Sequence, residues 1–403
     1  MELKIALRNV FRNRRRTAFS LTVIAVGTAV FLFVLAYVGE ALLSERLSSA
    51  CETGAVQVAD ERLFASQANG YDHLISPELQ ARVVDLVTKR PGVLGTSLEL
   101  DFAGLIGDAN GSTLVVGRGL TPCDCVPNTT CYAIEGKPIS GGDAREAVLG
   151  RRLGAKLGVD TGASINIATG TVTGNFSAAT VTVVGQVSYS LGTVEEQLGL
   201  FPTGFVQHLL KTDGVERILI GLDDLNKAPQ FADELRRALA AEGIPLGVRT
   251  WQDLSTGYAS SQSFYAAFSG LAGISVFALV FFSVVEILTI SFLERTREVA
   301  TTRAFGATRW RVFRGFLLEG AAIGAIGAVI GVVLASVLTL AFNAARITWM
   351  PPGSAVPQAI HLSLSLSTAL VPLVTVILAT VASSVYPAWK NARSSVVKAL
   401  QAV

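Results

Sequence analysis

Four long runs of apolar residues constrain this chain more than any other feature. They cover residues 19–38, 267–292, 320–343 and 364–386, and Glu286 is the only charged residue inside them. A helix needs roughly 20 mostly apolar residues to cross a bilayer, so each run is long enough to span it. The mean hydropathy of the chain, +0.49, is also high for a soluble protein of this size. We therefore predict an α-helical membrane protein with four transmembrane helices.

A large segment of ordinary soluble composition separates the first span from the second. Its roughly 220 residues can form one large domain or two small ones. Strand-like runs at residues 55–58 and 217–222 and helix-like runs at 77–89 and 228–241 frame a Gly- and Thr-rich stretch with short strand signals. We expect a large α/β domain in which an α/β lobe carries an inserted β-rich lobe near residues 121–200.

Charge fixes the expected orientation. The external segment holds 17 Lys/Arg against 25 Asp/Glu, whereas basic residues dominate the flanks of the spans. Basic flanks stay in the cytoplasm. The expected order begins with a cytoplasmic amphipathic lead-in helix (1–18), an uncleaved transmembrane helix 1 (19–42) and the extracytoplasmic, periplasmic domain (43–266). Transmembrane helix 2 (267–292), a cytoplasmic helix (293–314) and transmembrane helix 3 (315–343) follow. The chain then has a short external connection (344–363), transmembrane helix 4 (364–386) and a cytoplasmic tail (387–403).

The loop between the second and third spans is dense in arginine. Apolar residues recur in it at Val299, Phe305 and Trp310 among charges of both signs, which favours a short helix that Gly306 ends or kinks. Such a block either sets topology as a solvated loop or docks on another protein, and the pattern leaves both interpretations open. Its arginines are Arg295, Arg297, Arg303, Arg309, Arg311 and Arg314.

All the cysteines fall in the external segment, at Cys51, Cys123, Cys125 and Cys131. An even number outside the cytoplasm suits disulfides in an oxidising compartment, and four cysteines allow three pairings. A metal site is the alternative, but no histidine lies near the cluster in sequence, so we expect no metal.

Two features inside the spans have more than one interpretation. An ionisable group in lipid is expensive, so Glu286 is expected to form a helix–helix contact or to act as a coupling switch. Small residues four apart let helices approach closely, either within one subunit or at a seam between two subunits. The two such pairs on the third span are Gly320/Gly324 and Gly327/Gly331.

Several segments together resemble the FtsX/MacB family of ABC transporter permeases. The strongest match is the block ERTREVATTRAFGAT at residues 294–308. ALRNVFRNRRRTAFS (6–20) resembles the family's lead-in, and AVLGRRLGAKLGVDTGASINI (147–167) its MacB-like periplasmic core signature. FLLEGAAIGAIGAVIG (316–331) and YPAWKNARSSVVKALQ (386–401) are similar to its third span and tail. The resemblance covers nearly the whole chain and extends to LolC/LolE-like and MacB-like membrane subunits.

The resemblance implies that ATP hydrolysis occurs in a partner. No G-x-x-x-x-G-K-[ST] motif occurs in the 403 residues, so we expect no cofactor in this chain and ATP with Mg in a separate ATPase subunit. The implied assembly is a pair of ATPase subunits with two permease subunits, identical or homologous. The residues implied to couple to the ATPase are Glu294, Arg295, Arg297, Glu298, Val299, Arg303, Phe305, Gly306 and Ala307.

The expected function follows from the family. The chain is expected to be a non-catalytic permease subunit in a bacterial inner membrane, extracting or exporting a lipidated or hydrophobic substrate such as a lipoprotein. The alternatives are MacB-like tripartite efflux of drugs or peptides and FtsX-like mechanotransmission that regulates cell-wall hydrolases. Membrane lipids and a periplasmic carrier, lipoprotein or adaptor protein are possible partners. No catalytic motif and no basic stripe with interleaved aromatic residues appears, which argues against an enzyme and against nucleic-acid binding.

Overall fold

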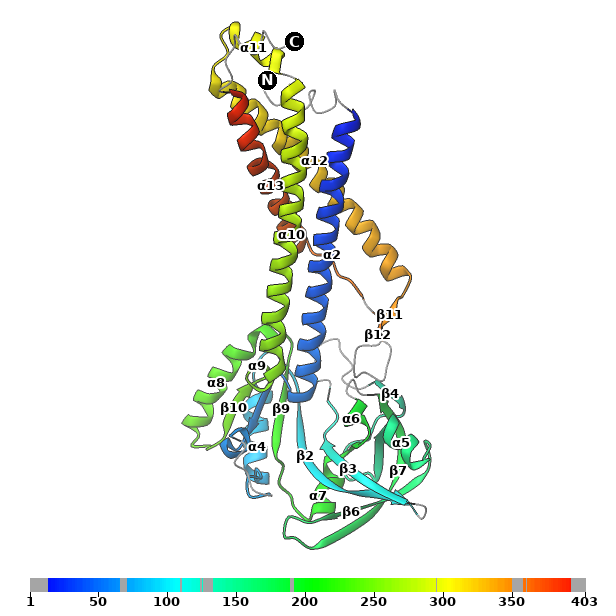
Figure 1. The fold of residues 1–403 in the computed structure, drawn as a ribbon. Helices are drawn as coiled ribbons and strands as arrows, with labels where there is room; N and C mark the ends of the chain where they lie inside the picture. Colours follow the sequence, from blue (N-terminus) through cyan, green and yellow to red (C-terminus); the bar gives the residue numbers. More distant parts are fainter. Residues whose placement is uncertain are drawn as a thin grey trace. The chain divides into compact units, whose positions relative to one another are not determined.

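The computed structural model describes residues 14–65, 71–108, 111–123, 125, 133–188, 192–294, 296–349, 358–359 and 361–392 (Figure 1). The chain divides into two compact units, which we describe separately. The membrane unit comprises Met1–Leu42, Ser261–Ile347 and Ala359–Val403, and the external unit comprises Leu43–Ser260 and Thr348–Gln358. The first part of the expected lead-in and most of the expected tail lie outside the described residues.

Four helices of the described chain are long and apolar enough to cross a membrane. They belong to α2 (Arg14–Thr53), α10 (Thr256–Glu294), α12 (Arg309–Ala344) and α13 (Leu366–Ala392). The four-helix prediction is therefore confirmed. The first two helices, of 40 and 39 residues, are longer than a bilayer requires, and each continues without interruption into the external unit.

A short helix, α11 (Thr296–Ala304), connects α10 to α12. Within the membrane unit it lies at the same end of the bundle as the start of α2 and the end of α13 (Figure 1). The basic flanks of the spans therefore share one end, as a common cytoplasmic side requires. A two-stranded pair, β11 (Thr348–Trp349) and β12 (Gln358–Ala359), follows α12 at the other end.

Both ends of the external segment form an α/β lobe. Its antiparallel sheet has the order β10 (Gly247–Thr250), β1 (Val56–Ala59), β9 (Arg217–Leu222) and β2 (Val93–Asp108). One core includes residues of α4 (Pro77–Thr88) and α8 (Ala228–Ala241) together with Trp251 of α9 (Trp251–Leu254). The strongly amphipathic pattern of α8 explains its position, because its apolar side (Phe231, Leu235, Leu239) is buried in this core.

The rest of the external unit is a closed ring of strands. Among the described residues, β6 pairs with both β2 and β7, so the order β2-β3-β8-β5-β7-β6 returns to β2. A separate core fills this ring and includes Leu100, Ile167 and Phe201. The other strands are β3 (Gly111–Leu120), β4 (Ala133–Gly136), β5 (Glu146–Gly150), β6 (Ser164–Gly170), β7 (Phe176–Ser188) and β8 (Leu198–Pro202), and the remaining short helices are α3 (Glu61–Phe64), α5 (Arg151–Leu157), α6 (Gly192–Glu195), α7 (Thr203–Leu210) and the 3-10 turn η1 (Leu225–Lys227).

The two lobes of the external unit share β2. The first half of this 16-residue strand pairs with β9 in the α/β lobe, and its second half pairs with β3 and β6 in the ring. The core of the ring draws residues from Leu100 to Leu210, a wider range than the expected 121–200. The strand that leaves one lobe thus begins the other.

Candidate coupling site

The turn after α11 is fixed by its backbone. Gly306 has a φ of 95°, a conformation that favours glycine, and the Ala307 N–H donates to the Thr302 carbonyl at 3.2 Å. This arrangement ends a helix in the manner of a Schellman motif. Thr308 then caps α12, because its side chain accepts a hydrogen bond from the Arg311 N–H at 3.3 Å. The sequence expectation that Gly306 ends the helix agrees with this geometry.

The turn presents a bulky aromatic side chain to the surroundings. Phe305 is 89% exposed, and Trp310, at the start of α12, is 63% exposed. The Trp310 ring stacks on Phe313 with centroids 5.4 Å apart, so its orientation is defined by the helix itself. Exposed aromatic residues anchor many protein interfaces. Phe305 and Trp310 therefore form an exposed apolar surface at this end of the bundle, of the kind that a partner protein contacts.

The opposite side of α11 packs on the membrane unit. Ala300 is 3% exposed, and Val299 packs against the same core as Phe316 and Leu288. Val299, which the sequence analysis expects to anchor a partner, is half-buried, and part of its side chain contributes to the core of its own chain. Phe305 is placed differently, since it follows the last residue of the helix and turns away with the chain.

The predicted coupling residues and the nearby arginines differ in their exposure. Glu294, Glu298 and the three arginines of α12 are exposed, whereas Arg303 and Ala307 are half-buried. Arg295 lies outside the described residues, and the side chain of Arg297 is not described although its backbone belongs to α11. Exposed charges at the rim of an interface mainly steer and orient a partner. The three arginines of α12 are Arg309, Arg311 and Arg314.

The glycine pairs of α12 lie against two different helices of the same chain. A side chain at Gly320 would place its Cβ 1.8 Å from Ser384 Oγ, and one at Gly324 would place it 2.0 Å from Thr380 Oγ1, both on α13. At the next pair, Gly327 lies against Ile24 of α2, and Gly331 lies against Thr28 of α2 at 2.5 Å. These glycines allow close packing within one subunit.

Glu286 lies on α10 inside the second span, and its side chain is exposed. The other helices of this chain therefore leave its carboxylate open to the surroundings. Among the described residues, no hydrogen bond or ion pair joins Glu286 to another helix, and an ionisable group at this depth is expensive unless it meets a polar partner.

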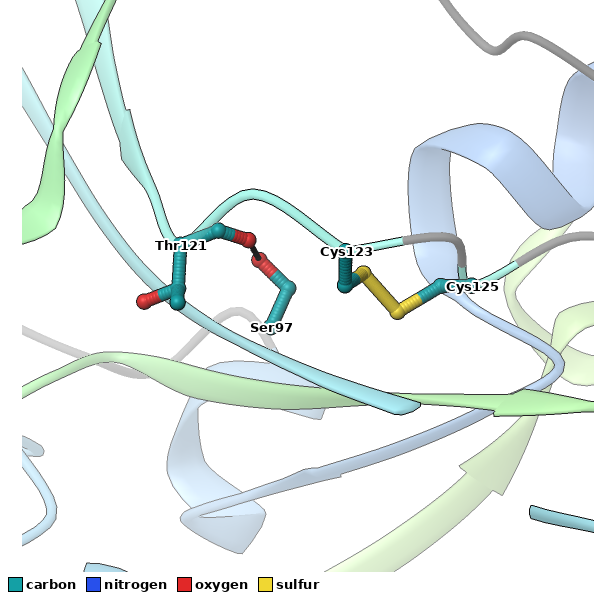
Figure 2. Close-up of a disulfide and its surroundings, with 4 residues drawn as sticks. All are labelled: Ser97, Thr121, Cys123 and Cys125. Carbon is teal, nitrogen blue, oxygen red and sulfur yellow. Dashed lines mark hydrogen bonds between the residues drawn. A yellow bond between two sulfur atoms is a disulfide. The ribbon is translucent and has the colours of Figure 1, made fainter. Parts of the chain in front are cut away.

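The cysteines form a local staple beside β2. Cys123 and Cys125 are bonded to each other, with Cα atoms 5.2 Å apart, and the Ser97 hydroxyl donates to the Thr121 carbonyl at 2.7 Å nearby (Figure 2). Cys51 is also disulfide-bonded, and Cys131 lies outside the described residues. The loop lies against β9, where a Cβ at Gly221 would meet the Cys125 carbonyl oxygen at 2.2 Å. Only glycine leaves room for this approach.

A buried ion cluster lies where β2 passes from one lobe to the other. Arg217 donates to Glu99 at 3.0 Å and also to Asp101, while Arg118 lies 3.6 Å from Asp101. Burial raises the pKa of Glu99 against the opposing effect of Arg217, and burial followed by the charge of Asp101 raises the pKa of Glu216. This cluster was not predicted from the sequence. The available signal was the alternate placing of Glu99 and Asp101 on one strand and the position of Glu216 directly before the strand that starts at Arg217.

The described residues contain no group of three or more His, Cys, Asp or Glu that could hold a metal ion.

Comparisons with known proteins agree on one family. The profile of the family described as FtsX-like permease C-terminal matches residues 270–396. The lipoprotein-releasing system transmembrane protein LolC of Xylella fastidiosa (strain Temecula1) is 24% identical over 270 residues, or 63% of this chain and 64% of that protein. The chain thus spans less than two thirds of this relative. The macrolide export ATP-binding/permease protein MacB of Campylobacter jejuni (strain 81-176) is 39% identical over 74 residues, or 18% of this chain and 12% of MacB.

Two solved structures align with about half of the chain. The periplasmic region of MacB from Actinobacillus actinomycetemcomitans is 10% identical, with a TM-score of 0.36, and the alignment covers 50% of this chain and 91% of that one. The extracellular domain of the transporter YknZ from Gram-positive bacteria is 12% identical, with a TM-score of 0.35, over 48% of this chain and 99% of that one. The profile match over residues 270–396, the LolC and MacB relatives and the four apolar helices together support an ABC transporter permease of the FtsX/MacB family.

Proposed function

We propose that this chain is the permease subunit of an ABC transporter in a bacterial inner membrane, and that it passes the energy of ATP hydrolysis in a separate ATPase subunit to its external unit. The observation that carries the proposal is the turn after α11. Phe305 is 89% exposed at the basic end of the bundle, next to a helix whose other side is held by Ala300. A rigid element with an exposed aromatic residue and a charged rim suits docking to a partner.

Two continuous helices support the transmission step. Both α2 and α10 run from the membrane unit into the external unit without a break, so a rotation or shift of either helix moves the backbone on both sides of the membrane. Inside the external unit, Ser49 of α2 and Ser255, the residue directly before α10, share a hydrogen bond of 3.0 Å. Packed elements of this kind move as bodies and do not deform continuously.

The proposed substrate is a lipidated or hydrophobic molecule, with a lipoprotein as the leading candidate. The support is the extent of the match, since the LolC relative aligns over 270 residues and the MacB relative over 74. The working assembly in this proposal contains two ATPase subunits that bind ATP with Mg and a second permease subunit, identical or homologous. A carrier, lipoprotein or adaptor on the outer side completes it.

Association with the ATPase tests the docking step. A Phe305→Ala chain is compared with a Phe176→Ala chain, because Phe176 is also strongly exposed but lies on β7 of the external unit. Loss of an interface anchor costs about 2 kcal/mol or more, so we expect roughly 30-fold weaker association of the ATPase with the first variant and no change with the second. Equal association and equal ATPase stimulation in both variants would contradict the proposal.

A reconstituted assay tests the substrate. The purified complex in vesicles is given ATP with a triacylated lipoprotein, a macrolide or a cell-wall hydrolase, each in a separate reaction. The proposal predicts ATP-dependent release of the lipoprotein to a soluble carrier. Transport of the macrolide alone, or activation of the hydrolase alone, assigns the chain to the corresponding alternative instead.

A further inference from the structure

A cavity of about 440 Å³ opens between three helices of the membrane unit. Phe31 of α2, Ile274 and Phe277 of α10 and Val371 of α13 form its walls, so its lining is almost entirely apolar. The volume lies in the range of small-molecule sites, about 300–1,000 Å³.

Two glycines of α10 create the cavity. A Cβ at Gly273 would lie 2.9 Å from Phe31 Cζ, so this glycine admits the aromatic ring that closes one side. A Cβ at Gly270 would have no atom within 4 Å, so this position opens directly into free space. Because the two are one helical turn apart, α10 presents a smooth groove there.

One polar group at the cavity lacks a partner. The Ser269 hydroxyl oxygen is buried and has no hydrogen-bond partner among the described residues. The other hydroxyl in the lining, on Thr375, donates to the Val371 carbonyl at 2.8 Å and is therefore satisfied by its own helix. Burying a hydroxyl without a hydrogen-bond partner costs free energy. A ligand that enters the cavity with a hydrogen-bond acceptor would offset this cost at Ser269.

The three helices place the cavity in the same half of the membrane. At about 1.5 Å per residue, Phe31 lies about 26 Å along α2 from Arg14, Gly270 lies about 36 Å along α10 from Glu294, and Val371 lies about 32 Å along α13 from Ala392. All three reference residues are at the basic end of the bundle (Figure 1). With a hydrocarbon core of about 30 Å, these distances place the cavity near the outer edge of the leaflet farthest from that end, at the depth where acyl chains join their headgroups.

We propose that this cavity binds one ester-linked acyl chain of a membrane phospholipid from the outer leaflet. The hydrocarbon would lie along Gly270 between the rings of Phe31 and Phe277, and the ester carbonyl oxygen would accept the Ser269 hydrogen bond. A helix of a second protein is about 10–12 Å across and does not fit a cavity of this size. The bilayer is the immediate source of hydrocarbon, which singles out a phospholipid. The proposal concerns a lipid site and does not depend on the identity of the transported substrate.

Photochemical labelling tests the site. The full chain in nanodiscs receives a phospholipid with a diazirine on its acyl chain, and labelled peptides are mapped by mass spectrometry. The expected label falls on residues 269–277. Gly270→Leu fills the cavity and is expected to reduce that label at least 10-fold. Gly39→Leu is the matched control, because Gly39 lies on α2 and also has no atom within 4 Å of its Cβ position. It should label like the unmodified chain.

Two further arms separate the sources of hydrocarbon and test the hydroxyl. Ser269→Ala removes one hydrogen bond and should lower labelling of the same peptide by about 2- to 10-fold. A triacylated peptide at equal mole fraction should not displace the phospholipid label. Equal labelling in the Gly270→Leu and unmodified chains overturns the site. Complete displacement by the triacylated peptide overturns the assignment to phospholipid.

Discussion

The guanidinium carbon of Arg46 lies 5.5 Å from the centroid of the Trp251 ring. Arg46 belongs to the external part of α2, and Trp251 starts α9, directly before α10. Trp251 is 1% exposed, and the ring of Tyr258 on α10 meets it edge-on at 4.7 Å. The buried indole of Trp251 therefore contacts the ends of both long helices within the external unit. A movement of either helix would displace this side chain and the core around it.

Removal of this indole should weaken the α/β lobe. Trp251→Ala is expected to lower the free energy of unfolding of the external unit by about 3–5 kcal/mol, because it leaves a large cavity in the core. Trp251→Phe keeps a ring against Tyr258 and should cost less. Hydrogen exchange of the β1, β9 and β10 amides in the full chain measures both. Protection in the alanine variant equal to that of the unmodified chain would show that Trp251 does not hold this lobe.

Close packing between α12 and α13 should require glycine at position 320. Gly320→Ala places a methyl group 1.8 Å from Ser384 Oγ, so we expect destabilisation of about 1–3 kcal/mol. Ser384→Ala in the same chain removes the clashing oxygen and leaves a 3.0 Å contact with the Ser384 Cβ. Most of the lost stability should therefore be recovered in the double variant. Thermal unfolding in detergent gives the values. The control is Gly315→Ala, where nothing lies within 4 Å, and a loss there as large as at Gly320 would contradict the packing.

The external unit should lose stability as pH rises above about 4.5. Burial holds the folded pKa values of Glu99 and Glu216 above the ordinary carboxyl value of 4.5. The folded state then binds more protons than the unfolded state between 4.5 and the raised values, so the unfolding free energy falls with increasing pH in that window. Asp60, whose pKa is lowered first of all by the Arg62 side chain, acts below its ordinary value of 3.8 and leaves this window unaffected.

The contribution of one carboxyl can be isolated. Glu216→Gln removes a titrating group, and the fall of the melting temperature between pH 4.5 and 7 should become shallower. Glu135→Gln is the control, because Glu135 lies on β4 at an exposed position. A pH dependence that is identical in the two variants would show that Glu216 does not titrate in this window.

The Cys123–Cys125 loop should require glycine at position 221 of β9, against which it packs. Gly221→Ala directs a methyl group to 2.2 Å from the Cys125 backbone oxygen, and backbone cannot rotate away as a side chain can. We expect a loss of about 1–3 kcal/mol in the external unit and faster reduction of the disulfide by a thiol. Gly141→Ala, with open space around it, should change neither quantity. An unaltered reduction rate in Gly221→Ala would place the loop elsewhere.

Local signals in the sequence predicted much of the fold. The apolar runs are long enough to require membrane helices, and the strand at Arg217–Leu222 and the helix at Ala228–Ala241 begin and end where the residue pattern placed them. In each case the elements are defined by periodicity, by turn residues or by length. These signals act over ten to twenty residues, which is the range that a sequence pattern reveals.

Long-range pairing is what the sequence could not reveal. The ring closes because Leu105–Gly107 pairs with Asn166–Ala168, about sixty residues apart, and no local pattern encodes that register. Likewise, the sequence pattern shows Val299 only as an apolar residue within a charged helix. In the structure its side chain packs against residues from other spans. The ion cluster around Arg217 also depends on three strands meeting.

Photo-crosslinking from position 305 in native membranes tests directly whether this turn docks on an ATPase subunit. A photoreactive amino acid replaces Phe305, which is strongly exposed at the basic end of the bundle, and the crosslinked proteins are identified. We expect a crosslink to an ATP-hydrolysing subunit on the cytoplasmic side, and none to that subunit from the same amino acid at position 176 on β7. A crosslink from position 305 only to proteins outside the cytoplasm, or to no ATPase in the intact complex, would contradict it.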